Sequence, residues 1–295
     1  MGEFLLVAFA GFFAAMVDGA LGMGFGPTSS AILLTTGISP AAVSATVNLA
    51  KVASGVAAGV SHWRLNNVDR KLVLALAIPG AVGALVGALV LSNVSGDTIR
   101  PFLAVLLMLV GIRILFRFSQ ALPASRGAAD DDAVSLRAPQ FSVPGVEVAG
   151  FAGGVTNGLV GAWGPVVTPF LLHRGLPPRY AIGSVNTAEV AVAVVSAGTL
   201  ITALGRGGID TRFLAAMLIG GVVAAPLAAY CVRLVPARLL GLAVAGLLLL
   251  TQTRELATAY HFSDSRWIAY ASIPAVVALA ALRPRIARRF RRSIP

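Results

Sequence analysis

Long apolar runs separated by short polar segments make up most of the chain. Leu72–Leu91 and Phe213–Cys231 contain no charged residue, and each is long enough to cross the hydrocarbon core of a bilayer as a helix. Similar hydrophobic segments recur near 41–61, 99–118, 180–204, 238–252 and 267–282. The pattern predicts an all-α fold, a polytopic transmembrane helical bundle.

The pattern occurs twice, with its polar and glycine positions about 139 residues apart. The matching elements are Gly11-Phe12 and Gly150-Phe151, Asp18-Gly19-x-x-Gly22 and Asn157-Gly158-x-x-Gly161, Pro27 and Pro165, and Asn48-x-x-Lys51 and Asn186-x-x-Glu189. Duplication with broken hydrophobic helices is typical of secondary transporters. We therefore divide the chain into a first repeat at 1–118, a linker at 119–143, a second repeat at 144–282 and a basic tail at 283–295.

The basic residues predict how the segments are oriented. With the linker and the C-terminal tail in the cytoplasm, 17 Lys and Arg residues lie on the cytoplasmic side and five lie outside. This bias follows the positive-inside rule. Segment 41–61 then runs inward while its counterpart 180–204 runs outward, so the two repeats are expected to have inverted topology.

Each repeat is expected to open with a Gly-rich broken or re-entrant helix, at 4–36 and at 146–172. A helix that starts at such a break directs unpaired N–H groups at the space beside it, which favours an anion. Close helix packing is the alternative role for these glycines, but matched breaks in both halves favour a binding site. The substrate-binding candidates here are Gly22, Gly24, Gly26, Thr28, Ser29, Gly161, Trp163 and Gly164.

Two ionisable residues are predicted at the middle of the bilayer, Lys51 in 41–61 and Glu189 in 180–204. A charge at that depth is costly and usually functional. Repeat symmetry places the two opposite each other, with Asn48 and Asn186 three residues earlier on the same helix faces. They either form a docking ion pair or act in transport, with Lys51 and both asparagines binding an anion and Glu189 carrying a proton.

The residues just before the breaks, Asp18 and Asn157, are candidates for two roles. Either can cap the start of a half-helix, which is the simpler expectation for both. Asp18 is also a candidate for proton coupling, because it is one of few acidic residues predicted inside the membrane.

Composition narrows the function further. Hydrophobic residues make up 57% of the chain and charged residues 12%, so the net charge of +11 is expected to meet lipid headgroups and not nucleic acid. One cysteine and three scattered histidines offer no metal site, and no cofactor is expected. The chain lacks Gly-x-Ser-x-Gly, His-Glu-x-x-His and Walker motifs. It is therefore not expected to be an enzyme, and uphill transport would need an ion gradient.

The order of these motifs resembles the sulfite exporter TauE/SafE family, also called DUF81. The resemblance rests on Gly19-x-x-Gly22-Met-Gly24-Phe-Gly26-Pro27, His62-Trp-Arg-Leu-Asn-Asn-Val-Asp69, Pro79-Gly80-Ala-x-Gly83-Ala-x-x-Gly87, Gly158-x-x-Gly161-Ala-Trp-Gly164-Pro165 and Gly220-Gly221-Val-Val-Ala-Ala-Pro226-Leu-Ala-Ala-Tyr230. It covers nearly the whole chain except the linker and tail. Ala162 and Trp163 stand where the family pattern favours glycine.

The resemblance implies a multi-pass carrier in a bacterial inner membrane. Such a carrier exports sulfite, sulfoacetate or other organosulfonates and is coupled to protons. The sequence leaves open a carrier of another small ion or carboxylate, or a membrane scaffold subunit. The expected partners are a small anion and the lipid bilayer, with a homodimer as one possible assembly.

Overall fold

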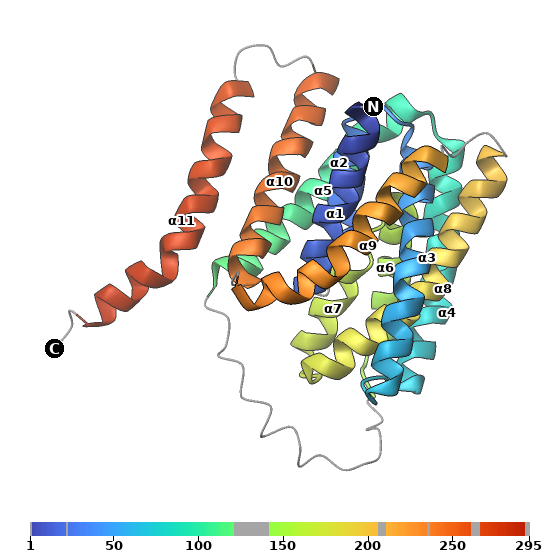
Figure 1. Cartoon of the computed structure of the whole chain (residues 1–295), viewed down its shortest axis with the longest axis horizontal. Helices are drawn as coiled ribbons and strands as arrows, with labels where there is room; N and C mark the ends of the chain where they lie inside the picture. Colours follow the sequence, from blue (N-terminus) through green and yellow to red (C-terminus); the bar gives the residue numbers. More distant parts are fainter. Residues whose placement is uncertain are drawn as a thin grey trace.

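The computed structural model describes residues 2–21, 23–120, 142–205, 211–234, 237–260 and 266–292. Within these ranges the chain is helical and has no strand. In Figure 1 the elements follow one another as α1 (Gly2–Leu21), α2 (Phe25–Leu34), α3 (Pro40–Arg64), α4 (Arg70–Asn93), α5 (Gly96–Ser119), α6 (Val146–Val160), α7 (Gly164–His173), α8 (Pro178–Leu204), α9 (Thr211–Leu234), α10 (Ala237–Ala259) and α11 (Arg266–Arg292). The predicted all-α fold is confirmed.

Five helices in the described ranges are long and apolar enough to cross a membrane. They are α3, α4, α5, α8 and the Arg238–Ala259 part of α10. A helix satisfies its own backbone hydrogen bonds, which is why such apolar sequences become helical in lipid. Local signals set some boundaries: the Asp69 carboxylate accepts hydrogen bonds from Lys71 N at 2.9 Å and Leu72 N at 3.3 Å, and it caps α4.

Two helices, α2 and α7, have only ten residues each. At about 1.5 Å per residue each spans roughly 15 Å, half the thickness of a bilayer core. Each returns along the helix before it. Phe13 of α1 and Ile32 of α2 line one groove, and Val167 and Phe170 of α7 lie against Gly153 and Gly145. The chain thus forms two antiparallel helical hairpins, α1–α2 and α6–α7.

The long helices pack in pairs, and a pair in one half has a corresponding pair in the other. Helix α4 packs along α6 as α9 packs along α1, while α3 packs against α8 and α5 against α10. Glycines allow the backbones to touch in the first two interfaces. A Cβ at Gly154 of α6 would overlap the carbonyl of Gly80, and one at Gly220 of α9 would overlap the carbonyl of Ala8. Small residues at helix contacts are what membrane packing requires.

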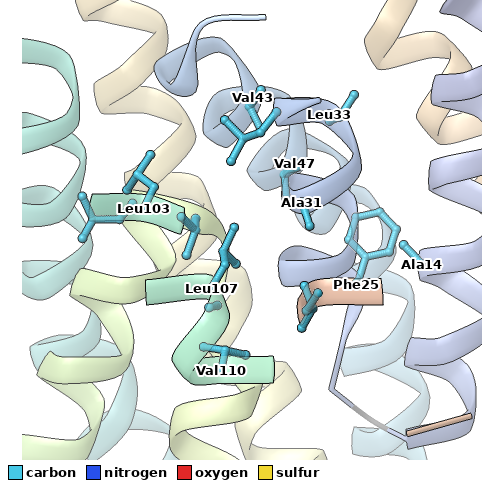
Figure 2. Packing of buried hydrophobic residues seen from close by; sticks show 14 of the residues in the cluster. Ala14, Phe25, Ala31, Leu33, Val43, Val47, Leu103, Leu107 and Val110 are labelled. Carbon is cyan, nitrogen blue, oxygen red and sulfur yellow. The ribbon is translucent and has the colours of Figure 1, made fainter. Parts of the chain in front are cut away.

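A hydrophobic cluster joins the α1–α2 hairpin to α3 and α5. Figure 2 shows Phe25 beside Ala14, with Val43 and Val47 of α3 nearby and Leu107 of α5 among the residues that complete the cluster. A second cluster surrounds the buried Trp163 and joins α4, α6, α7 and α8. Each hairpin therefore packs against neighbouring helices through one of the two clusters. Helix α11 lies at the edge of the bundle beside α10 (Figure 1).

The helices agree with the expected hydrophobic segments, with two differences. The first piece of the opening segment is longer than expected, because α1 reaches 20 residues. Helix α11 continues to Arg292, so most of the expected basic tail extends a helix. Nearly all of the 119–143 linker, residues 121–141, lies outside the described residues.

Candidate functional site

The tips of the two hairpins meet near the middle of the bundle. Gly26, in the first turn of α2, lies against Gly161, which ends α6 in a left-handed conformation with φ of 69°. A Cβ at Gly26 would overlap the Gly161 carbonyl group. The Ser30 hydroxyl donates to Val160 O at 2.9 Å, and the Ser44 hydroxyl donates to Gly158 O at 2.7 Å. Elements about 130 residues apart in sequence thus share one junction.

The hairpins reach this junction from opposite ends of α5. Near the start of α5, Arg100 donates to the carbonyls of Gly37 and Ile38, just beyond the C-terminus of α2. Further along α5, Arg113 lines a hollow with His173 and Arg174 at the C-terminus of α7. The C-termini of α2 and α7 therefore lie toward opposite ends of the bundle, while the turns of the two hairpins meet at Gly26 and Gly161.

The start of α2 is already occupied by a carboxylate. Gly24, the N-cap residue, has φ of 153°, a conformation that side-chain-bearing residues rarely adopt. The next N–H group, Phe25 N, donates to Asp18 Oδ1 at 3.3 Å. A negative charge is favoured at a helix N-terminus. Asp18 therefore lies where a capping carboxylate would lie, and its role in capping or in proton coupling stays a prediction.

The Lys51 ammonium is buried and has three acceptors. Its Nζ donates to the Glu189 carboxylate, to Gly161 O at 2.7 Å and to Asn157 Oδ1 at 3.2 Å. The side chain of Lys51 is 7% exposed and that of Glu189 is 19% exposed. The expected pairing of Lys51 with Glu189 is present, and it joins α3, α6 and α8. An ammonium has three N–H groups, so the hydrogen-bonding capacity of Lys51 is filled.

Asn157 is the hub of a buried polar network. Its Nδ2 group donates to Asn48 Oδ1 at 2.7 Å and to Ser196 Oγ at 3.1 Å, while Oδ1 accepts from Lys51. Asn48 in turn donates to Ser44 O at 2.9 Å. The expectation that Asn157 caps a half-helix is wrong, because these partners take up its side chain.

A small cavity of about 10 Å³ lies where these groups meet. That is close to the space one water molecule needs. Its chemistry comes from three ionisable side chains: Asp18, Lys51 and Glu189. The rest of the lining comes from the two breaks, namely Met23, Gly24, Phe25, Gly26, Pro27, Gly161, Gly164 and Pro165.

Five of the predicted site residues that the structure describes do not line this cavity, and Asn48 is one of them. Trp163 is fully buried in the second cluster, and its Nε1 donates to Val185 O at 3.1 Å. Asn186 is half-buried and forms no hydrogen bond within the described residues, whereas its counterpart Asn48 is buried and bonded. The Thr28 and Ser29 hydroxyls are buried and have no partner in the described part of the chain. Gly22 lies outside the described residues.

Sequence reasoning missed two members of the network, Ser44 and Ser196. Both are fully buried. A signal was available for each, because Ser44 precedes Asn48 by four residues and Ser196 follows Glu189 by seven, so each shares a helix face with a predicted site residue. No group of three or more His, Cys, Asp or Glu that could hold a metal occurs among the residues that the structure describes.

The family model described as "Sulfite exporter TauE/SafE" matches residues 7–254, which include the Lys51–Glu189 pair, the α6–α7 hairpin and all but the first residues of the α1–α2 hairpin. The chain belongs to this family. It is also 40% identical over 261 residues to "Probable membrane transporter protein YtnM" of Bacillus subtilis (strain 168), covering 87% of this chain and 83% of that protein. No solved structure matches.

The family and the relative identify a membrane transporter and not an enzyme. The five apolar helices are those of a multi-pass membrane protein, whose surroundings are the lipid bilayer. The TauE/SafE resemblance predicted from the sequence is confirmed.

Proposed function

We propose that this TauE/SafE transporter is a secondary carrier that exports sulfite, sulfoacetate or another small organosulfonate across the bacterial inner membrane, coupled to protons and working by alternating access. The observation that carries the proposal is the central cavity. There a helix start and a lysine ammonium, the two groups suited to an anion, are each bonded to a carboxylate of the chain.

The proposed architecture is a pair of inverted repeats. It is supported by the order of the helices, with α1–α5 followed by α6–α10, and by the matched packing of α4 on α6 and α9 on α1. It is also supported by the hairpins, which approach from opposite ends of α5 and meet at Gly26 and Gly161. In this arrangement α1–α2 and α6–α7 are re-entrant, and the linker and C-terminus are cytoplasmic.

The proposed substrate site is the space between the two breaks. Lys51 supplies the positive charge, and the N–H groups at the starts of α2 and α7 supply further donors. A cation carrier would need an open position beside its acidic groups, Asp18 and Glu189. Here the Lys51 ammonium fills the position between Glu189 and Asn157, which argues for an anion.

The same contacts support a proton coupling in which the proton and the anion bind together. When an anion takes Lys51, the Glu189 carboxylate loses its cation at a site where an unpaired charge is costly. Protonation of Glu189 removes that cost, so proton and anion bind together and move in the same direction. The empty carrier returns with the Lys51–Glu189 pair re-formed. Outward transport is then driven by the outward gradient of the anion.

The cavity in this structure, at about 10 Å³, is smaller than any of these anions. We assign it to an occluded, unloaded state in which Asp18 and Glu189 stand in for the substrate. Loading requires the hairpin tips to separate at Gly26 and Gly161, which opens the site to one end of the bundle. Alternating access follows if the two tips separate on opposite sides in turn.

The test is a thermal-shift screen of the purified protein followed by transport in proteoliposomes. Sulfite and sulfoacetate should stabilise the protein, and taurine, thiosulfate and simple carboxylates are the comparison set. Lys51→Met should remove the shift. Stabilisation by carboxylates alone would identify the substrate as a carboxylate. Absence of both stabilisation and flux with every anion would favour the scaffold alternative.

A further inference from the structure

We propose that the anion enters and leaves through two basic hollows, one at each end of the bundle. The first, the α7 hollow, has a volume of about 400 Å³ and lies at the C-terminus of α7. The second, the α2 hollow, has a volume of about 700 Å³ and lies at the C-terminus of α2. The inference rests on the proposed function, because it names the routes to the site described above.

The α7 hollow combines basic groups from two helices. Arg113 comes from α5, and His173 and Arg174 come from the end of α7, all three exposed. The Arg174 guanidinium lies 5.2 Å from the centre of the Phe170 ring, which holds it at the rim. Among the residues that the structure describes, none that lines this hollow is acidic. A concave surface with charge of one sign raises the local concentration of the opposite ion.

The α2 hollow has the same sign of charge at the other end. Arg254 of α10 is exposed there beside Thr251 and Thr258, and Trp267 of α11 forms part of the wall. The neighbouring acid, Glu255, is paired with Arg100 at 3.9 Å. Arg254 itself has no carboxylate partner in the described ranges, and none of the lining residues is acidic. Its charge is therefore directed at whatever fills the hollow.

The two hollows occupy corresponding places in the two halves. Each lies between the C-terminus of a ten-residue helix, α2 or α7, and the later part of its partner helix, α10 or α5. Each short helix has its other end at the central cavity. A distance of roughly 15 Å along the helix therefore separates hollow from cavity.

Two simpler explanations account for only part of this pattern. Basic residues stabilise helix C-termini, which explains His173 and Arg174 but not Arg113 or Arg254, because these approach from another helix. A phosphate of a lipid headgroup has the same chemistry as a free anion and would suit an arginine near Trp267. Fluorescence quenching in detergent and in nanodiscs distinguishes a lipid phosphate from a free anion.

The first experiment measures the charge at the α2 hollow without transport. Of the three tryptophans, Trp163 is fully buried, so Trp63→Phe leaves Trp267 as the accessible fluorophore. In uncharged detergent, iodide should quench Trp267 more strongly than caesium does, relative to neutral acrylamide. Arg254→Gln should lower the iodide-to-acrylamide ratio by about twofold. An equal iodide-to-acrylamide quenching ratio with and without Arg254 would overturn the proposal that the α2 hollow attracts anions.

The same measurement in nanodiscs identifies the source of the anion. If the hollow is open to water, the iodide preference in phosphatidylcholine nanodiscs should equal that in detergent, and sulfite should compete with iodide. Loss of the preference in the bilayer would mean that a lipid headgroup fills the hollow, which also overturns the proposal. These readouts do not need transport, so they hold or fail independently of the substrate assignment.

The second experiment measures sulfite transport from each side in oriented proteoliposomes. Arg113→Gln with Arg174→Gln should raise the KM about tenfold at the α7 end, leave kcat unchanged and flatten the dependence on ionic strength. Arg254→Gln should raise the KM and flatten the ionic-strength dependence only at the end of the α2 hollow. Arg64→Gln, an exposed arginine outside the hollow, is the matched control. An equal effect of Arg64→Gln, or effects on both ends from one hollow, would overturn the proposal.

Discussion

Lys51 of α3, which is buried, and Glu189 of α8, which is partly buried, form an ion pair across the junction of the two hairpins. The pair joins equivalent positions of the two halves, separated by 138 residues. Lys51 also holds the end of α6 through Gly161 O. This one pair therefore links α3, α6 and α8, and breaking it would remove a contact that all three helices share.

The first prediction concerns Glu189→Gln, which mimics a permanently protonated acid. Lys51 keeps its two neutral acceptors, so the loss of folding free energy should be near 3 kcal/mol, at the low end for a broken buried pair. Exchange of radiolabelled sulfite across proteoliposomes should persist. Net efflux and the accompanying change in internal pH should be lost, because the empty carrier cannot re-form the pair. Net efflux with proton movement at the normal rate would assign proton coupling to another group.

The second prediction separates charge from geometry at Lys51. Lys51→Met should abolish sulfite-dependent stabilisation, while Lys51→Arg should retain part of it, because the charge persists and the donor geometry changes. Combining Lys51→Met with Glu189→Gln should restore the melting temperature, since no buried charge is left unpaired. Transport by that double variant would exclude a direct role for both residues and leave only docking.

The third prediction uses Asp18 to distinguish helix capping from coupling. Asp18→Asn keeps an acceptor for Phe25 N but removes the charge, so the fold should be retained and sulfite binding should depend less on pH. Asp18→Ala removes the acceptor as well and should cost about 1 kcal/mol of stability. The measurements are thermal unfolding with and without sulfite at neutral and acidic pH. An unchanged pH dependence in Asp18→Asn would limit Asp18 to capping.

The hydrophobic pattern predicted most of the fold because membrane helices are specified locally. Runs such as Leu72–Leu91 have one stable backbone conformation in lipid, so their helices could be recognised without knowledge of their neighbours. The ion pair was also predictable, since duplication and depth placed Lys51 and Glu189 opposite each other.

The roles of individual side chains at the breaks were not predictable, because they depend on tertiary contacts. Trp163 follows Gly161 closely in sequence, yet it packs on Gly80 and Gly153 and bonds to Val185. The side chain of Asn157 looked like that of a helix cap, and only the packing of α3 and α8 on α6 brings Asn48 and Ser196 within reach of it. A repeat pattern in the sequence indicates which residues are equivalent. The side chains that each residue contacts are set by the tertiary packing of the bundle.

The fourth prediction concerns membrane topology. In a Cys231→Ala background, which removes the single native cysteine, Ser95→Cys and Gln120→Cys lie at opposite ends of α5. A membrane-impermeant thiol reagent applied to intact cells should label Ser95→Cys and should label Gln120→Cys only after lysis. A cysteine in the C-terminal segment should behave like Gln120→Cys. Labelling of the linker and the C-terminus from opposite sides would contradict the inverted-repeat proposal.

The last prediction tests the contact between the hairpin tips. Gly26→Ala places a Cβ inside the Gly161 carbonyl group, so α2 and α6 must move apart. The rigid backbone on both sides leaves little room for relaxation, and we expect loss of sulfite transport together with about 1–3 kcal/mol of destabilisation, as in other overpacked sites. Gly59→Ala is the matched control, because Gly59 is also buried in a helix but its Cβ would lie 3.7 Å from the nearest atom, Thr187 Oγ1. Normal transport in Gly26→Ala would show that the tips need not touch during the cycle. Equal losses in both variants would show that transport is sensitive to any added methyl group, and the junction would then have no special role.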